Sequence, residues 1–275
     1  MTNVLINGFE ETSIDVRDRG FQYGDGLFET ISYTNKKLQF WDEHMQRLRN
    51  SCNRLSLACV DESLWLEDID KLELDDNSVV KLMISRGVSG RGYIYAEGDS
   101  VTRVTASFAM PDYPEEHRQG ITTTICKTPI SINAALAGMK HLNRLDNVLA
   151  RNEWNDSDIT EGFMFDSHDH VIEGTMSNVF CVMGDELYTP LLERCGVEGV
   201  MRQQVINIAA ELKIPVNIVD ISKQNFLQMD AVFVTNSLIG IWPVKKIIDD
   251  EDSVDFKQHK MLDDINHKLI QLMSI

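Results

Sequence analysis

Hydrophobic and polar positions divide the first part of the chain into short strands and amphipathic helices. Residues 27–33, 79–85 and 101–109 have the composition of strands, and in the last of them apolar and polar residues alternate. Between residues 42 and 57, apolar side chains recur at helical spacing after a favourable N-cap residue. These patterns predict short strands interrupted by two helical segments, up to about residue 109.

Beyond residue 120, strand and helix patterns alternate. Strands are predicted at 121–126, 162–166, 178–183 and 231–236, and helices at 142–154, 201–213 and 257–273. Residues 110–120 have two prolines and five charged or histidine side chains, which is typical of a solvated linker. We therefore predict an α+β or α/β protein with a smaller N-terminal domain at 1–109, a linker at 110–120 and a larger C-terminal domain at 121–275.

Charge narrows the classes of function. Among 275 residues, 26 Lys and Arg stand against 43 Asp and Glu, which gives a net charge of −17. No basic tract is present, so the electrostatic footprint of a nucleic-acid-binding protein is absent, and binding to an anionic membrane surface is disfavoured. A small anionic substrate is still compatible with this composition, because local charge rather than net charge determines what a pocket binds.

Cysteine usage and the N-terminal segment indicate the compartment. The five cysteines form no CxxC pair, and their spacing matches neither a zinc site nor a disulfide framework, so we expect thiols in a reducing compartment. Residues 1–11 have no basic residue and no apolar core, so we expect no secretory signal. No uncharged stretch reaches the ~20 residues that a membrane helix needs, which favours a cytoplasmic protein.

Lys140 is the first residue with candidate chemistry. It follows the small and apolar residues 137–139 and precedes a helical pattern. An apolar environment disfavours the charged form of a lysine, and the neutral amine is then a nucleophile or a base. The alternative is a surface lysine whose charged end lies in water.

Three further segments each allow a functional and a structural interpretation. Glu173 precedes a glycine turn, where a carboxylate can face a cofactor or can simply be an exposed turn residue. Residues 196–202 place glycines before a helix, where backbone N–H groups can bind phosphate or only form a turn. Residues 85–93 carry two arginines among three glycines, which suits capture of a carboxylate but is also typical of a flexible hairpin.

Other common site types have no support in the sequence. His168 and His170 form a His-Asp-His turn, but no further ligands accompany them, so we predict no metal site. The chain contains no Gly-x-Ser-x-Gly, P-loop or GxGxxG motif, which leaves a serine hydrolase, a nucleoside triphosphatase and a dinucleotide enzyme without support.

Taken together, these segments resemble the fold-type-IV pyridoxal phosphate (PLP) enzymes, which include branched-chain aminotransferases, D-amino acid aminotransferases and aminodeoxychorismate lyases. The resemblance runs in order over nearly the whole chain, through Asp18-Arg19, 21–30, His44-x-x-Arg47, 85–93, the Lys140 segment, 173–180, 199–202 and 236–244. It implies a two-domain, D-amino acid aminotransferase-like architecture, PLP as the cofactor and a homodimer.

The resemblance also implies which residues bind the cofactor. Lys140 would be the Schiff-base lysine and the general acid/base. Glu173 would pair with the pyridine nitrogen and keep it protonated. The groups expected to bind the phosphate are the Arg47 side chain, the backbone N–H groups of Val200 and Met201, and Ser237 and Asn236.

Segments 85–93 and 138–149 look most like those of the lyases, which convert 4-amino-4-deoxychorismate to 4-aminobenzoate and pyruvate. Phe28, Arg91 and Tyr93 would then contact the substrate, and the Thr30 hydroxyl would supply a proton. Glu29 departs from the lyases, which often have a second threonine there. The alternatives are an aminotransferase acting on D-amino or branched-chain amino acids and, from a different class, a non-catalytic binding protein that keeps the fold for its pocket.

Overall fold

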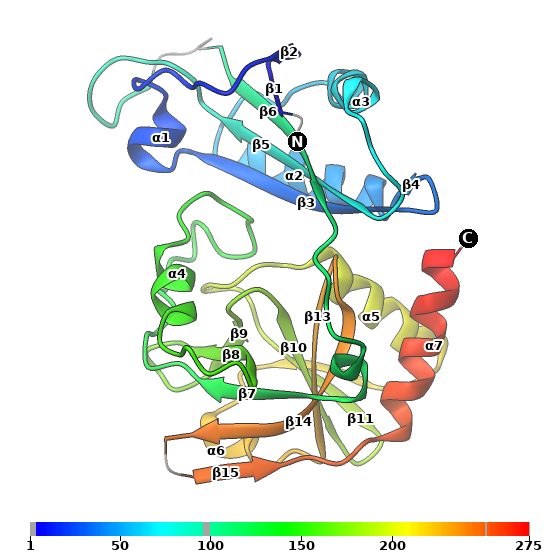
Figure 1. Cartoon of the computed structure of the whole chain (residues 1–275). Coiled ribbons are helices and arrows are strands. Elements are labelled where there is room, and N and C mark those ends of the chain that lie inside the picture. Colours follow the sequence, from blue (N-terminus) through cyan, green and yellow to red (C-terminus); the bar gives the residue numbers. More distant parts are fainter. Residues whose placement is uncertain (1–3, 96–99, 251, 275) are drawn as a thin grey trace. The chain divides into compact units, whose positions relative to one another are not determined.

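The computed structural model describes residues 4–95, 100–250 and 252–274, and the chain forms two compact units. The first unit comprises Met1–Pro111 and Met139–Asn143, and the second comprises Asp112–Gly138 and Arg144–Ile275. Each unit combines helices with one sheet, so the mixed α and β content predicted from the sequence is confirmed (Figure 1).

A six-stranded antiparallel sheet, in the order β2-β1-β6-β5-β3-β4, forms the centre of the first unit. Its strands are β1 (Val4–Ile6), β2 (Phe9–Glu10), β3 (Gly26–Thr34), β4 (Lys37–Leu38), β5 (Ser78–Ser85) and β6 (Thr102–Ala109). The three longest strands confirm the three strands predicted in this region. The other three have two or three residues each, which is too short for an alternating pattern.

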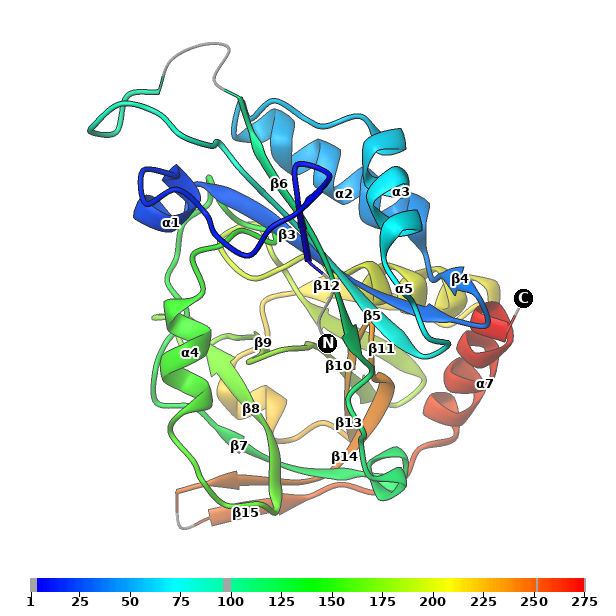
Figure 2. The same ribbon diagram turned by 45° about the horizontal axis from the view of Figure 1, so that its top comes forward.

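Helices α2 (Trp41–Arg54) and α3 (Glu62–Lys71) cover one face of this sheet, and the short α1 (Arg19–Tyr23) lies beside β5 (Figure 2). Side chains along β3 alternate between the face that packs against the helices and the opposite face. Leu27, Glu29 and Ile31 are buried on the face toward α2, whereas Phe28 and Thr30 point to the opposite face. Alternation therefore buries Glu29 against α2 and leaves Phe28 and Thr30 partly exposed.

The second unit contains a nine-stranded mixed sheet in the order β12-β11-β10-β13-β14-β7-β8-β9, with β15 paired to β14. The pairs β11–β12, β14–β7 and β7–β8 are parallel, and the others are antiparallel. The strands are β7 (Ile121–Ile125), β8 (Ile159–Phe165), β9 (Val171–Gly174), β10 (Asn178–Met183), β11 (Glu186–Pro190), β12 (Val216–Val219), β13 (Ala231–Asn236), β14 (Gly240–Asp249) and β15 (Asp252–Asp255).

The helices of the second unit are η1 (Glu115–Gln119, a 3-10 helix), α4 (Leu145–Arg151), α5 (Val200–Glu211), α6 (Lys223–Phe226) and α7 (Lys260–Ser274). Helices α5 and α7 pack on each other and against β13 and β14 (Figure 2). The predicted helix at 142–154 is shorter than expected, because at its start the backbone N–H of Leu142 donates to the Gly26 carbonyl of β3. The predicted helices at 201–213 and 257–273 are confirmed by α5 and α7.

The expected linker differs from the structure. Only its first two residues, 110–111, belong to the first unit, and the rest packs on the second unit. The rings of Tyr113 and His117 lie 4.9 Å and 4.8 Å from the ring of Trp242, both edge-on. Prolines and charges suggested a solvated segment, but two aromatic rings give it an apolar surface to bury.

The Lys140 segment also differs from the expected domain boundaries. The C-terminal domain was expected to carry this lysine, but residues 139–143 pack with the first unit. The backbone N–H of Phe28 donates to the Lys140 carbonyl at 2.9 Å, and that of Leu142 donates to the Gly26 carbonyl at 3.0 Å. Pairing with the open edge of β3 is thus the physical reason for the difference, and chain order does not reveal it.

Candidate active site

Phe28 and Thr30 lie on the face of the first sheet that is not covered by α2 and α3. In the antiparallel register, Thr30 is opposite Lys81 of β5, so their side chains share this face. The Lys81 ammonium lies 5.4 Å from the centroid of the Phe28 ring. Lys81 was missed by the sequence interpretation, although its position on β5 opposite Thr30 follows once the strand register is known.

Lys140 reaches the same aromatic ring from the edge of β3. Its Nζ atom lies 4.4 Å from the centroid of the Phe28 ring, within the range of a cation–π contact. The backbone hydrogen bond between Phe28 and the Lys140 carbonyl fixes the segment that carries the amine. The structure therefore brings together Lys140 and Phe28, two of the residues that the family resemblance selects.

Behind this strand, Glu29 joins His44 and Arg47 of α2 in a buried cluster. The His44 Nδ1 atom lies 2.7 Å from Glu29 Oε2, and Arg47 Nε donates to Oε1 at 2.9 Å while Nη2 bonds Oε2. Burial alone would raise the pKa of Glu29, but the Arg47 charge and the hydrogen bonds from both partners outweigh it and hold this pKa at about 2. Glu29 is therefore an anion that fixes the direction of the Arg47 guanidinium.

His44 is a neutral partner in this cluster. Burial lowers the pKa of its imidazole below the ordinary value, and this exceeds the opposing effect of Glu29. A neutral ring facing a carboxylate carries its proton on the nitrogen that faces it, so Nδ1 donates to Glu29. The motif His44-x-x-Arg47 thus has a physical basis: one helical turn presents both side chains to a single buried acid.

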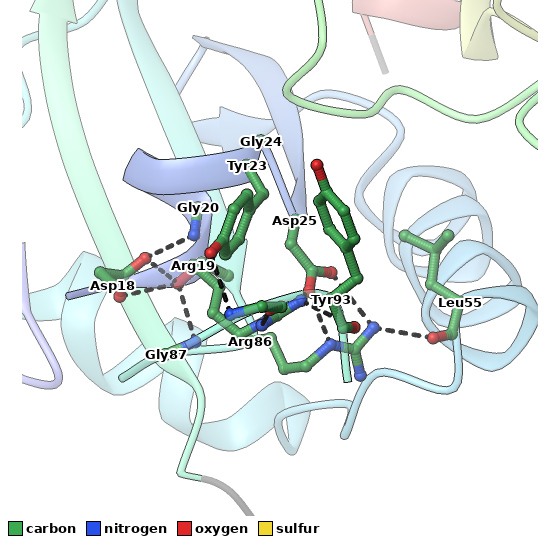
Figure 3. A network of polar contacts seen from close by, with 12 residues as sticks. Asp18, Arg19, Gly20, Tyr23, Gly24, Asp25, Leu55, Arg86, Gly87 and Tyr93 are labelled. Atoms are coloured by element: carbon green, nitrogen blue, oxygen red, sulfur yellow. Dashed lines mark hydrogen bonds and ion pairs between the residues drawn. The ribbon is translucent and has the colours of Figure 1, made fainter. Parts of the chain in front are cut away.

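Arg91 and Tyr93 lie on an exposed loop after β5, and Arg19 holds this loop by its backbone (Figure 3). Arg19 Nη1 donates to the Gly92 carbonyl at 2.8 Å, and Nη2 donates to the Tyr93 carbonyl at 3.3 Å. The Tyr93 side chain is 86% exposed. The two predicted substrate-binding side chains are thus accessible on a loop whose backbone is anchored.

In the second unit, Glu173 occupies β9, at the predicted place before a glycine turn. Its side chain is buried, and Oε2 accepts the backbone N–H of Val197 at 2.8 Å. Gly196 has a φ of 83°, and a Cβ there would lie 2.7 Å from a Leu192 methyl carbon. Only glycine allows this turn to approach the carboxylate closely.

The start of α5 is built for close approach as well. Its N-cap residue, Gly199, makes no side-chain hydrogen bond, so no cap side chain covers the backbone N–H groups of Val200 and Met201. A Cβ at Gly199 would lie 2.0 Å from Asn178 Oδ1, and Asn178 Nδ2 donates to the Val197 carbonyl at 2.8 Å. Asn178 of the Glu173 motif therefore holds the turn that leads into α5.

Asn236 ties the end of β13 to the turn after Glu173. Its Nδ2 donates to the Met176 carbonyl at 3.0 Å, and its Oδ1 accepts the backbone N–H groups of Leu238 and Ile239 at 2.8 Å and 3.0 Å. Both polar atoms of this side chain thus shape the turn that contains Ser237. A role in positioning Ser237 accounts for these contacts.

Glu161 shows in the sequence only as an acidic residue beside a predicted strand. In the structure its carboxylate is buried and accepts hydrogen bonds from five donors, which lie on Gly162, Thr175, Met176 and Ser177. The Thr175 hydroxyl contact is 2.6 Å and the Ser177 hydroxyl contact is 2.8 Å. A buried acid therefore fixes the turn that follows Glu173, which no sequence pattern indicated.

His168 and His170 flank a turn organised by Asp166. Asp166 Oδ1 accepts their backbone N–H groups at 2.9 Å and 3.0 Å. Burial opposes ionisation, but these hydrogen bonds outweigh it and lower the pKa of Asp166. Within residues 4–95, 100–250 and 252–274, no group of three or more His, Cys, Asp or Glu side chains could hold a metal ion.

Two further observations concern the cysteines and the membrane. All five cysteines lie in described segments and are thiols, four buried and Cys59 exposed. Over the same segments, none of the helices combines the length and the apolar character that spanning a membrane requires.

Comparison with known proteins identifies the family. The family model for amino-transferase class IV matches residues 26–247. An aminodeoxychorismate lyase of Vibrio harveyi is 33% identical over 258 residues, which cover 93% of this chain and 95% of that protein. A D-alanine aminotransferase of Listeria monocytogenes is 26% identical over 89% of this chain and 87% of that protein.

Solved structures agree with these relatives. A crystal structure of 4-amino-4-deoxychorismate lyase from Pseudomonas aeruginosa has a TM-score of 0.88 and 37% identity, covering 98% of this chain and 97% of that chain. The branched-chain aminotransferase from Escherichia coli has a TM-score of 0.84 at 23% identity over 98% of this chain and 93% of that chain, so it shares the fold. The predicted fold class is confirmed, and the chain belongs to the amino-transferase class IV family.

Proposed function

We propose that this chain is a PLP-dependent lyase that converts 4-amino-4-deoxychorismate to 4-aminobenzoate and pyruvate. The observation that carries the proposal is the match of more than nine-tenths of both lengths with lyases from Vibrio harveyi (33% identity) and Pseudomonas aeruginosa (37% identity). Thr30 supports it, because this residue places a hydroxyl on the same strand face as Phe28.

The donor set fits PLP. An amine is needed for the cofactor aldehyde, an anion for the pyridine nitrogen, and cationic or N–H donors for the phosphate. The chain offers Lys140 against an aromatic ring, the buried Glu173 carboxylate and the Arg47 guanidinium held by Glu29. The start of α5, which no side chain caps, offers backbone N–H groups of the kind that bind phosphate.

When bound, PLP supplies an electron sink conjugated with the amine of the substrate. In this proposal the Lys140 amine accepts the proton from the ring carbon that carries the substrate amine, and Glu173 keeps the pyridine nitrogen protonated. Arg47, Ser237 and the backbone N–H groups of Val200 and Met201 hold the phosphate.

The substrate side of the reaction needs a second proton donor. The C–O bond of the enolpyruvyl ether breaks, the methylene carbon gains a proton and pyruvate leaves, while the ring becomes aromatic. Thr30 is proposed to deliver that proton, and Arg91 is proposed to bind a substrate carboxylate, with Tyr93 and Phe28 contacting the substrate. The Lys81 ammonium, on the same face as Thr30, adds positive charge that favours an anionic substrate.

The test is incubation of the purified chain, loaded with PLP, with 4-amino-4-deoxychorismate, and assay of both products. We expect equal amounts of 4-aminobenzoate and pyruvate from the wild-type chain. Lys140→Ala is expected to yield neither product and to lose the visible absorption that a lysine-linked cofactor gives. Full turnover by Lys140→Ala, or an absence of both products from the wild type, contradicts the proposal.

An aminotransferase is the second candidate, because D-alanine aminotransferases match 26–28% of residues over most of this chain. It predicts conversion of D-alanine or leucine with 2-oxoglutarate at rates far above the lyase rate.

We also propose a cytoplasmic homodimer, as the family resemblance implies. Sedimentation at micromolar concentration tests the dimer, and a mass of one chain contradicts it.

A further inference from the structure

In the loop that carries Arg91, both backbone groups of Gly92 are bound to the body of the first unit. The Gly92 carbonyl accepts Arg19 Nη1 at 2.8 Å, and the Gly92 N–H donates to the Tyr23 hydroxyl at 3.3 Å. Both backbone groups of Gly92 are therefore bound by side chains of α1. Gly92 also has a φ of 92°, a conformation that favours glycine.

Arg19 is a rigid anchor for this loop. Its side chain is only 4% exposed, and Nε donates to Asp25 Oδ2 at 2.9 Å. Asp25 also accepts Arg86 Nε at 2.9 Å and Nη2 at 3.1 Å. Burial alone would raise the pKa of Asp25, but the two arginines outweigh it and lower this pKa, so the carboxylate stays ionised and holds both guanidinium groups.

Aromatic rings complete the anchor. The Tyr23 ring centroid lies 4.9 Å from the Arg19 guanidinium carbon and 5.6 Å from the Tyr93 ring centroid. Arg19 also donates to the Tyr93 carbonyl at 3.3 Å. Gly92 thus lies between Arg91, whose side chain is exposed, and Tyr93, whose backbone carbonyl is bound by Arg19.

We propose that Arg19 and Tyr23 are positioning residues that hold residues 91–93 in one conformation and so present Arg91 to the substrate carboxylate. This rests on the proposed function, in which Arg91 binds that carboxylate. A loop already held in its binding conformation loses less conformational freedom when substrate arrives, so the anchor raises affinity without touching substrate. Loss of this anchor is expected to raise KM and to leave kcat largely unchanged.

Kinetics of PLP-loaded variants give the first test. We expect Arg19→Gln to raise the KM for 4-amino-4-deoxychorismate roughly tenfold, with kcat within about threefold and an unchanged visible cofactor spectrum. Arg19→Lys, which keeps the charge, is expected to restore part of the affinity. Arg17→Gln is the matched control, because Arg17 pairs only locally with Asp15 on the surface. A KM equal to that of the control overturns the proposal.

Limited proteolysis tests the anchor without any assay of activity. Trypsin cleaves after arginine, and the bond between Arg91 and Gly92 is the one that the anchor holds. We expect mass spectrometry to show faster cleavage at this bond in Arg19→Gln, and a smaller increase in Tyr23→Phe. Gly92→Ala keeps both anchor side chains but strains the backbone, because its φ of 92° disfavours alanine, and is expected to raise both cleavage and KM.

The two arms separate the anchor from the reaction. Cleavage unchanged in Arg19→Gln and Tyr23→Phe overturns the anchor, and faster cleavage with unchanged KM overturns its role in substrate binding. A wild-type chain that makes no 4-aminobenzoate contradicts the proposed function, and the cleavage rates then still decide whether the anchor exists.

Discussion

Individual residues in the first unit show why an acidic side chain can occupy the interior of a sheet. The resemblance to the lyases pointed to a threonine at position 29, yet the Glu29 carboxylate is fully paired with His44 and Arg47. An unpaired charge at 1% exposure would be strongly destabilising, whereas a charge with several hydrogen bonds is tolerated. The departure noticed in the sequence therefore has a structural explanation that the sequence did not provide.

Acid stability is expected to depend on Glu29. Its pKa of about 2 lies below the ordinary value of 4.5, so its contribution is complete above pH 4.5 and is lost as the pH falls toward 2. Glu29→Gln is expected to lower the free energy of unfolding by about 3 kcal/mol at pH 7. The difference from wild type is expected to shrink between pH 4.5 and 2.

Urea titrations at several pH values, with equal PLP concentrations, measure this difference. Glu62→Gln is the control, because Glu62 forms an exposed pair with Arg49, and such pairs contribute about 0–1 kcal/mol. A Glu29→Gln variant as stable as the control at pH 7 would show that the cluster contributes nothing.

Thr30 carries the proposed difference between lyase and aminotransferase. Thr30→Ala removes the hydroxyl and leaves the strand intact, since alanine fits the partly exposed face. General acid assistance is typically a 10²–10⁴-fold effect, so we expect a loss of pyruvate formation of about that size with an unchanged cofactor spectrum. Thr30→Ser, which keeps the hydroxyl, is the matched variant. Equal rates for the alanine and serine variants would make Thr30 a packing residue.

At the level of elements, α2 shows which predictions the sequence supports. The apolar spacing located this helix correctly, but it begins at Trp41, where Phe40 is the N-cap residue with a φ of 56° and no side-chain cap. Asp42 and Glu43 instead lie in the first turn, where acidic residues favour the helix dipole. Spacing therefore predicts the buried face of a helix better than its first residue.

Arg47 and Arg49 on this helix offer a matched comparison for cofactor binding. Arg47 is bonded to buried Glu29, whereas Arg49 pairs with Glu62 at the surface. A hydrogen bond to a charged group contributes about 1.5–3 kcal/mol, so Arg47→Ala is expected to weaken PLP binding about tenfold or more. Arg49→Ala is expected to change it by less than about twofold. Equilibrium dialysis measures both, and equal retention by the two variants contradicts a phosphate role for Arg47.

For the molecule as a whole, local patterns predicted the long strands and helices, and long-range pairing determined the rest. Strand composition identified β3 and β5, alternation identified β6, and helical patterns identified α5 and α7. The attachment of residues 139–143 to β3 joins segments more than 100 residues apart, and the packing of Tyr113 on Trp242 does the same. Neither contact leaves a periodic signal, so neither could be predicted from the pattern.

Some residues of the candidate site were likewise predicted from the sequence, and others became apparent only from the fold. Sequence motifs selected Lys140, Arg47, Glu173 and the start of α5, because the family resemblance assigns a role to each of these positions. Two supporting groups were not selected, because Lys81 depends on strand register and Glu161 binds a distant turn. Arg19 belongs to a motif of the resemblance, but its role in holding the loop was not predicted. A side chain that binds backbone atoms can have any sequence around it, so the fold has to be known first.

Whether this chain is a lyase is tested most directly by a single turnover with enzyme in excess over 4-amino-4-deoxychorismate. Absorbance follows the cofactor while quenched samples are assayed for 4-aminobenzoate and pyruvate. A lyase forms one pyruvate per 4-aminobenzoate, and its spectrum returns to that of the starting enzyme without any keto acid. Accumulation of pyridoxamine phosphate without 4-aminobenzoate or pyruvate, with PLP and glutamate formed when 2-oxoglutarate is added, would contradict the account and identify an aminotransferase.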